Sequence, residues 1–158
     1  MRIRLPRRWE WLVVGLIFAV LLLLVLPDVQ TIDWVGSIDL EVEFAVTDAA
    51  TGGPVPGAAI DIHSEGGFYE EREPRDFQLV AGADGRASHL CRNSMCFGQD
   101  SLFKHSFAVH LPFWLFRVSA PGYEPTDLAN LDVLEYRRAA KRVSPGRSKL
   151  VVPVALHK

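Results

Sequence analysis

The chain has 158 residues, of which 49% are hydrophobic and 23% charged, a composition that excludes disorder over the whole length. Its 12 glycines and 10 prolines follow no period, which excludes collagen and is typical of a turn-rich β protein. The net charge of -2 gives no overall electrostatic basis for a nucleic-acid partner, and two cysteines are too few for a disulfide-built miniprotein.

The N-terminal segment predicts a single-pass membrane anchor. Residues 1–10 form a basic tail, and an unbroken apolar run extends from Trp11 to Leu26. As a helix this run spans about 24 Å, slightly less than the hydrocarbon layer of about 30 Å. A cleaved signal peptide is the alternative, but no small-residue cleavage pattern follows the run. The sequence therefore favours a retained anchor in the cell membrane, with a cytoplasmic N-terminus and an extracytoplasmic remainder.

After an expected linker over residues 27–37, residues 38–158 predict a domain of short strands. Ile38–Phe44 alternates between apolar and acidic side chains, which is typical of a half-buried strand. Ala58–Ser64 repeats this pattern, with Asp61 and His63 expected to face solvent. The turn at Asp84-Gly85 predicts a hairpin whose return strand is Arg86–Cys91.

Two further strands are expected in the C-terminal half. Phe113–Ser119 places Arg117 and Leu115 on the face opposite Trp114. The last strand is Lys149–Leu156, and Pro153 predicts an edge position for it because proline cannot donate a hydrogen bond to a neighbouring strand. The segment between them, LANLDVLEYRRAAKR, fits helix or strand. The predicted fold is mostly β, a small antiparallel β-sandwich (prealbumin/Ig-like) behind one transmembrane helix.

Three stretches carry a family resemblance: VTDAATGGPVPGAAIDI (Val46–Ile62), AGADGRAS (Ala81–Ser88) and FRVSAPGYEP (Phe116–Pro125). Over roughly residues 38–156 the chain resembles the carboxypeptidase regulatory-like, or prealbumin-like, β-sandwich domains. The resemblance implies a noncatalytic module that rigidifies, spaces or binds. In this pattern Tyr123, after its Pro-Gly turn, is expected to fold back onto the sheet edge.

The chain departs from that family pattern in two charged or irregular insertions, residues 65–75 and 92–111. Insertions on a rigid sandwich commonly carry binding function. Within the second insertion, Phe97, Phe103 and Phe107, together with Trp114 after it, either cap the end of the sandwich or form a partner-binding patch.

Cys91 and Cys96 stand at the start of the second insertion with four residues between them. In an exported domain they favour a disulfide that staples this loop, the alternative being two reduced thiols. With His105 and His110 they also make up a set of zinc-ligand types. The spacing of the cysteines is wider than usual, and oxidation would remove the thiolates, so zinc is kept as an alternative.

Two clusters of charged residues are interpreted as solvent-exposed faces of the domain. The acidic alternation Asp39, Glu41 and Glu43 offers oxygen ligands for calcium, although it also discourages aggregation between sheet edges. A basic cluster follows near the C-terminus. Its members are Arg137, Arg138, Lys141, Arg142, Arg147 and Lys149.

No nucleophile elbow, phosphate loop or zincin motif is present, so no catalytic residue and no cofactor is predicted. The sequence predicts a noncatalytic, membrane-anchored module that binds or scaffolds a protein or glycan in the cell envelope, in contact with the lipid bilayer and not with nucleic acid. The alternative is an extracytoplasmic zinc-binding domain or metal-dependent enzyme that uses Cys91, Cys96, His105 and His110.

Overall fold

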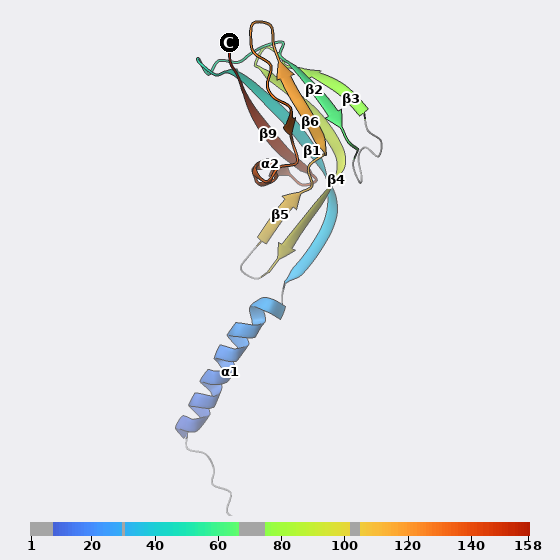
Figure 1. Ribbon diagram of the computed structural model, residues 1–158. Coiled ribbons are helices and arrows are strands. Elements are labelled where there is room, and N and C mark those ends of the chain that lie inside the picture. The colour runs from blue at the N-terminus through green and yellow to red at the C-terminus, as the bar shows by residue number, and fades with distance from the viewer. Residues whose placement is uncertain (1–7, 30, 67–74, 102–104) are drawn as a thin grey trace, which may run out of the picture. The chain divides into compact units, whose positions relative to one another are not determined.

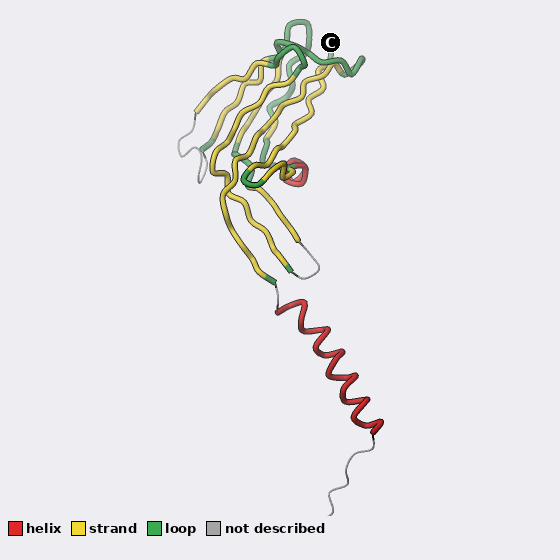
Figure 2. Tube along the Cα trace, turned by 180° about the vertical axis from the view of Figure 1, so that it is seen from behind, coloured by secondary structure: helices red, strands yellow, loops and turns green. Residues whose placement is uncertain are grey.

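The computed structural model describes residues 8–29, 31–66, 75–101 and 105–158. The chain divides into two compact units. Unit 1 comprises Met1–Trp34 and Gly98–Ser106, and unit 2 comprises Val35–Phe97 and Phe107–Lys158. Unit 2 contains most of two β-sheets, whose strands are visible in Figures 1 and 2.

Unit 1 begins with helix α1 (Arg8–Val29), whose side chains are largely exposed. In the described part of the chain, no helix combines the length and the apolar character that crossing a bilayer requires. The membrane anchor predicted over Trp11 to Leu26 is therefore unsupported by the described residues. Residues 1–7 of the expected basic tail lie outside the described residues.

The strands form two sheets, as predicted for a sandwich. The first sheet has the order β5-β4-β1-β9-β8 and the second the order β3-β2-β6-β7. In chain order the first sheet uses β1 (Ile32–Asp48), β4 (Arg86–Asp100), β5 (His105–Val109), β8 (Lys141–Ser144) and β9 (Arg147–Leu156). The second sheet uses β2 (Ala59–Ser64), β3 (Arg75–Val80), β6 (Trp114–Ser119) and β7 (Ala129–Asn130), and α2 (Leu134–Ala139) lies between β7 and β8 in the chain.

The core forms where the apolar positions of the alternating strands meet. Leu40, Val42 and Phe44 of β1 are completely buried, as is Ile60 of β2. The rings of Phe44 and Phe116 join the two sheets edge to face, with their centroids 5.1 Å apart. The predicted strand positions and inward faces are therefore confirmed. β1 itself begins at Ile32, inside the expected linker.

The sheets are not purely antiparallel, because β1 pairs in parallel with β9 from Asp39↔Arg147 to Asp48↔Leu156. This pairing brings outward-facing carboxylates of β1 against cations of β9. Glu41 accepts a hydrogen bond from Arg147 Nη2 at 2.6 Å, and this contact lowers the pKa of its carboxyl. Glu43 accepts one from Lys149 Nζ at 2.8 Å. Glu41 and Glu43 of the acidic face are thus paired with cations of β9 rather than arranged for calcium.

β9 lies inside its sheet, whereas Pro153 predicted an edge strand. The short strand β8 pairs with β9 only at residues 147–149 of β9. Pro153 lies beyond this stretch and pairs with Ala45 of β1, the neighbour on the opposite side of β9. The missing N–H of Pro153 therefore costs no hydrogen bond of the β8–β9 ladder. The segment LANLDVLEYRRAAKR, for which the sequence fits helix or strand, contains both: β7 lies near its beginning and α2 in its second half.

Asp48, at the end of β1, is an anchor point for three parts of the chain. Its carboxylate accepts backbone hydrogen bonds from Ala50 and Thr51, one from the Tyr123 hydroxyl at 2.9 Å, and an ion pair from Lys158 Nζ at 3.0 Å. The Lys158 ammonium first, and the Tyr123 hydroxyl next, hold the pKa of Asp48 well below its usual range. The expectation that Tyr123 folds back onto the sheet is confirmed.

In unit 1, a tryptophan packs directly over a glycine. Trp34 Nε1 donates to Asp100 Oδ2 at 3.0 Å, and Gln99 Nε2 donates to Asp33 Oδ1 at 3.1 Å. A Cβ atom at Gly98 would overlap the Trp34 ring and the Ser106 carbonyl oxygen. Only glycine allows this close approach of ring and backbone.

We expect Asp48→Asn to remove an acid-sensitive part of the stability. A carboxyl whose pKa is lower in the folded chain stabilises it above the ordinary Asp pKa of about 3.9, and this contribution is lost as the pH falls. In thermal unfolding followed by circular dichroism, the midpoint temperature should fall less between pH 7 and pH 3 in Asp48→Asn than in the unmodified chain. Asp127→Asn, a matched change at an exposed position, should behave as the unmodified chain does. Equal acid sensitivity in the Asp48 variant would contradict the role of this carboxylate.

We expect Gly98→Ala to destabilise the packing around Trp34 by about 1–3 kcal/mol, because an added methyl in a filled space forces the neighbours apart. Amide hydrogen exchange should accelerate at residues 98–100 and 105–106. Gly15→Ala is the control, since nothing lies within 4 Å of the Cβ it would add. Unchanged exchange in Gly98→Ala would show that the ring can move without cost.

Candidate functional site

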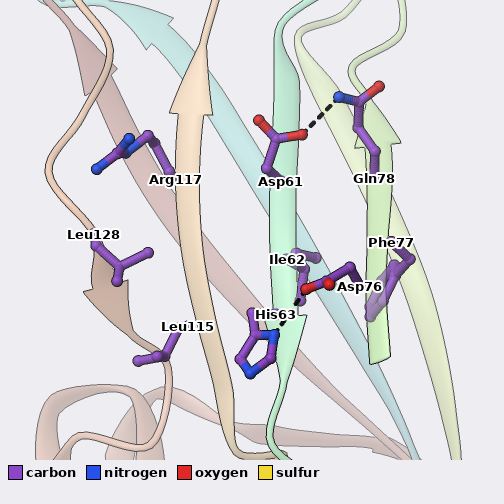
Figure 3. Close-up of a pocket in the computed structure, with 9 residues that line it drawn as sticks. All are labelled: Asp61, Ile62, His63, Asp76, Phe77, Gln78, Leu115, Arg117 and Leu128. Carbon is purple, nitrogen blue, oxygen red and sulfur yellow. Dashed lines mark hydrogen bonds and ion pairs between the residues drawn. The ribbon is translucent and has the colours of Figure 1, made fainter. Parts of the chain in front are cut away.

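The outer face of the four-stranded sheet carries a shallow groove of about 660 Å³ within unit 2 (Figure 3). The strands β2, β3 and β6 supply most of its lining. The lining residues are Asp61, Ile62, His63, Asp76, Phe77, Gln78, Leu115, Arg117 and Leu128.

Strand alternation brings the polar side chains of the groove to one face. On β2, Ile60 and Ile62 point into the core, so that Asp61 and His63 face outward. Because β2 pairs with β3 on one side and with β6 on the other, Asp61 lies between Gln78 and Arg117. By the same register, His63 lies between Asp76 and Leu115.

Two hydrogen-bonded pairs link β2 to β3. His63 Nδ1 lies 2.7 Å from Asp76 Oδ1, and Gln78 Nε2 donates to Asp61 Oδ1 at 2.6 Å. The side chains of His63 and Asp76 are 48% and 84% exposed. The imidazole is therefore held by a carboxylate on one nitrogen while the groove stays open to water.

Arg117 is the cation of the groove. Figure 3 shows its guanidinium turned away from Asp61, toward the side of β6 where Leu128 lies. Within the described ranges it forms no ion pair or hydrogen bond through its side chain. Leu128 is 56% exposed, so a charged group and an apolar surface stand side by side.

Phe77 lies in the groove wall and also in an aromatic cluster. Its ring is 5.3 Å from that of Trp114 and 5.0 Å from that of His89, centroid to centroid. Trp114 is completely buried, and its Nε1 has no hydrogen-bond partner among the described residues. Trp114 is therefore a core residue, which corrects the interpretation of it as part of a partner-binding surface.

The other aromatic residues expected at a binding patch do not share one environment. Phe97 is 46% exposed. Phe107 is partly buried, with the Arg142 guanidinium 5.7 Å from its ring centroid. Phe103 lies outside the described residues. Burial of Trp114 in the sandwich removes the largest member of the predicted patch.

The two cysteines are buried and form no disulfide, which contradicts the predicted bridge. Both lie on β4, and five residues of extended strand separate their Cα atoms by roughly 16 Å, whereas a disulfide spans at most about 7 Å. The left-handed conformation of Asn93, with φ of 56°, marks an irregularity between them that lets both face inward. Burial raises the pKa of the Cys96 thiol.

The structure does not assemble the alternative zinc site. His105 belongs to unit 1, while Cys91, Cys96 and His110 belong to unit 2. His105 Nδ1 pairs with Asp100 Oδ1 at 3.0 Å, and His110 Nδ1 donates to the Leu111 carbonyl at 2.9 Å. Among the residues that the structure describes, no three His, Cys, Asp or Glu side chains come together as metal ligands.

The basic cluster near the C-terminus is also largely engaged within the chain. Arg137 donates to both Asp132 oxygens, at 2.7 and 2.8 Å, which lowers the pKa of Asp132. Arg147 and Lys149 pair with the carboxylates of β1. These contacts agree with the interpretation of the cluster as a solvated face.

Sequence reasoning placed Asp61, His63 and Arg117 on outward faces but did not combine them into a site. Period-two alternation indicates which side of a strand a residue occupies, but not which strands become neighbours. Asp76 and Gln78 were not singled out, because nothing in the sequence indicated that β3 pairs with β2.

No family model and no curated protein matches the chain. Solved structures do share its fold. The match to 3-chlorocatechol 1,2-dioxygenase from Rhodococcus opacus 1CP has a TM-score of 0.51 at 10% identity and covers 77% of this chain and 60% of that one. Catechol 1,2-dioxygenase from Acinetobacter sp. ADP1 has a TM-score of 0.48 at 14% identity, covering 77% and 53%. An intradiol ring-cleavage dioxygenase from Tetranychus urticae has a TM-score of 0.44 at 13% identity, covering 77% and 81%.

These neighbours correct two interpretations. The resemblance to carboxypeptidase regulatory-like domains is not supported, since a solved structure that shares the fold is 3-chlorocatechol 1,2-dioxygenase. The expectation of a noncatalytic scaffolding module finds no support there either, since that neighbour is an enzyme. The chain spans 60% or less of the length of these first two structures. At such low identity, the similarity establishes the β-sandwich fold, and activity has to be argued from the site.

Dioxygen chemistry depends on a metal or an organic cofactor that the protein holds. Among the described residues, no group of three or more His, Cys, Asp or Glu side chains is placed to hold a metal. The chain thus shares a β-sandwich fold with 3-chlorocatechol 1,2-dioxygenase and carries, on the outer face of its four-stranded sheet, a groove that includes Arg117 and His63.

We expect both thiols to be reduced and protected in the folded chain. Cys91 and Cys96 are 3% and 5% exposed, and burial disfavours the thiolate that reacts with disulfide reagents. Dithionitrobenzoate should react slowly with the native chain and with two thiols after denaturation in guanidinium. A mass lower by about two units that reductant restores would contradict this arrangement.

Proposed function

We propose that the groove on the outer sheet face binds a small organic acid, as the substrate of an enzymatic site. The observation that carries the proposal is the exposed guanidinium of Arg117, which has no partner among the described residues and stands beside Leu115 and Leu128. A carboxylate can accept two parallel hydrogen bonds from such a guanidinium. The apolar part of the same ligand would cover the two leucines.

The size of the groove supports a small molecule. Its volume of about 660 Å³ falls within the range of roughly 300–1,000 Å³ that is usual for ligand sites. The named substrate class of the fold neighbours, catechols, is also of this size. That similarity supports an enzymatic rather than a scaffolding use of the fold.

The charges in the groove favour a ligand with one carboxylate. Asp61 and Asp76 lie on the same face as Arg117, so a second negative group on the ligand would meet like charges. Because the guanidinium is open to water, its ion pair with a ligand contributes modestly, and we expect affinities in the millimolar range. A ligand bound in the millimolar range has to be abundant to occupy the groove.

We expect Arg117→Gln to weaken the binding of butanoate about two- to fivefold, because an ion pair open to water contributes up to about 1 kcal/mol. The measurement is a titration of isotope-labelled full-length chain with butanoate, followed by NMR at the methyl groups of Leu115 and Leu128.

Arg92→Gln is the matched control, because Arg92 is an exposed arginine on β4 of the other sheet. It should bind butanoate as the unmodified chain does, and butanamide, which lacks the charge, should not shift the leucine signals. Equal butanoate binding in Arg117→Gln and the unmodified chain would refute the proposed site.

A further inference from the structure

We propose that the groove hydrolyses esters of organic acids, with His63 as the general base on water and Asp76 as its positioning residue. This inference rests on the proposed function, because Arg117 must first hold the acid. It adds a reaction class and a catalytic group to the binding site.

The hydrogen bond to Asp76 determines which nitrogen of His63 is available. A carboxylate can only accept, so Nδ1 carries the proton at the 2.7 Å contact with Asp76 Oδ1. The neutral imidazole then has its lone pair on Nε2. With 48% of the side chain exposed, this nitrogen can meet a water molecule in the groove.

The register sets the distance between the acid anchor and the base. His63 lies opposite Leu115 on β6, and Arg117 lies two residues further along the same strand. Diagonal neighbours of this kind have their backbones about 7–8 Å apart, and the Arg117 side chain extends from there toward Leu128. A substrate whose carboxylate is on Arg117 therefore places a group several bonds away, across Leu115, beside His63.

Hydrolysis is the reaction that fits the composition and the openness of the groove. Its lining residues include no Ser, Thr or Cys that could attack a substrate. Water is available on this exposed face, and it is the co-reactant. His63 Nε2 takes one proton from water, the water oxygen bonds to the acyl carbon, and the ester C–O bond breaks. The proton passes from the imidazolium to the departing oxygen, so that one acid and one alcohol or phenol leave.

The surrounding charges select the substrate. Asp76 lies opposite His63 on β3, and Gln78 lies two residues further along that strand. Arg117 is a diagonal neighbour of His63 on β6, and Asp61 and Glu65 flank His63 on its own chain segment. Because Arg117 is the one cation named among these carboxylates, the groove favours a substrate with one negative charge, bound to Arg117. The group of the substrate that lies beside His63 is then uncharged. The substrate class is the half-ester of a dicarboxylic acid.

The test compares full-length chains on mono-p-nitrophenyl glutarate, with p-nitrophenyl butanoate as the uncharged reference. We expect His63→Gln to lower kcat/KM on the glutarate ester at least about a hundredfold, the low end of what a positioned base contributes. His105→Gln is the matched control, since His105 also pairs with an aspartate, at 3.0 Å, but does not line the groove. It should change kcat/KM less than twofold.

Two further variants separate anchor, base and positioning residue. Arg117→Gln should raise KM for the glutarate ester and leave the butanoate ester unaffected. Asp76→Asn should lower kcat with little change in KM, and Asp76→Glu should restore part of it. Circular dichroism melting of each variant checks that these exposed substitutions leave the fold intact.

The outcomes distinguish the two proposals. Butanoate binding that depends on Arg117, without turnover of the glutarate ester above the buffer rate, would overturn this inference and leave the proposed function standing. Turnover unaffected by His63→Gln, or lowered equally by His105→Gln, would also overturn it. Absence of both binding and turnover in the unmodified chain would remove the proposed function together with it.

Discussion

The parallel pairing of β1 with β9 is the constraint on which the larger sheet depends. Ten residue pairs join the first and last long strands of the sandwich, and β1 in turn lies beside β4. A shift of one residue would move Leu40, Val42 and Phe44 from the core to solvent. Ion pairs of Glu41 and Glu43 with Arg147 and Lys149 exist only in the observed register, and the Asp48 anchor closes the end of the pairing.

The groove depends in the same way on β2, which pairs with a neighbour on each side. This central position aligns Asp76, His63 and Leu115 in one row and Gln78, Asp61 and Arg117 in the next. Two rows of outward side chains on a rigid sheet hold a base and a cation at a separation that the backbone determines. The chemistry proposed for this face therefore follows from strand order, in a chain whose described residues form no metal centre of three or more His, Cys, Asp or Glu ligands.

The corrected predictions share a physical cause. Cys91 and Cys96 are near in sequence, yet extended strand β4 holds them too far apart for a disulfide. Trp114 seemed suited to a surface patch because of its size and its aromatic neighbours, yet β6 turns it into the core against Phe77 and His89. Residues 92–111, expected as an inserted loop, are mostly the strands β4 and β5. In each instance local spacing was taken as spatial proximity.

The sequence alone determined the strands and their inward faces, because period-two alternation in Ile38–Phe44, Ala58–Ser64 and Phe113–Ser119 reflects burial of one side of each strand. It also determined that Tyr123 returns to the sheet after its Pro-Gly turn. Only the tertiary structure decided that β1 and β9 run in parallel and that β2 lies between β3 and β6. Pairing between distant strands depends on the packing of the whole sandwich, so the meeting of His63, Asp76 and Arg117 on one face could not be derived from any single stretch of the chain.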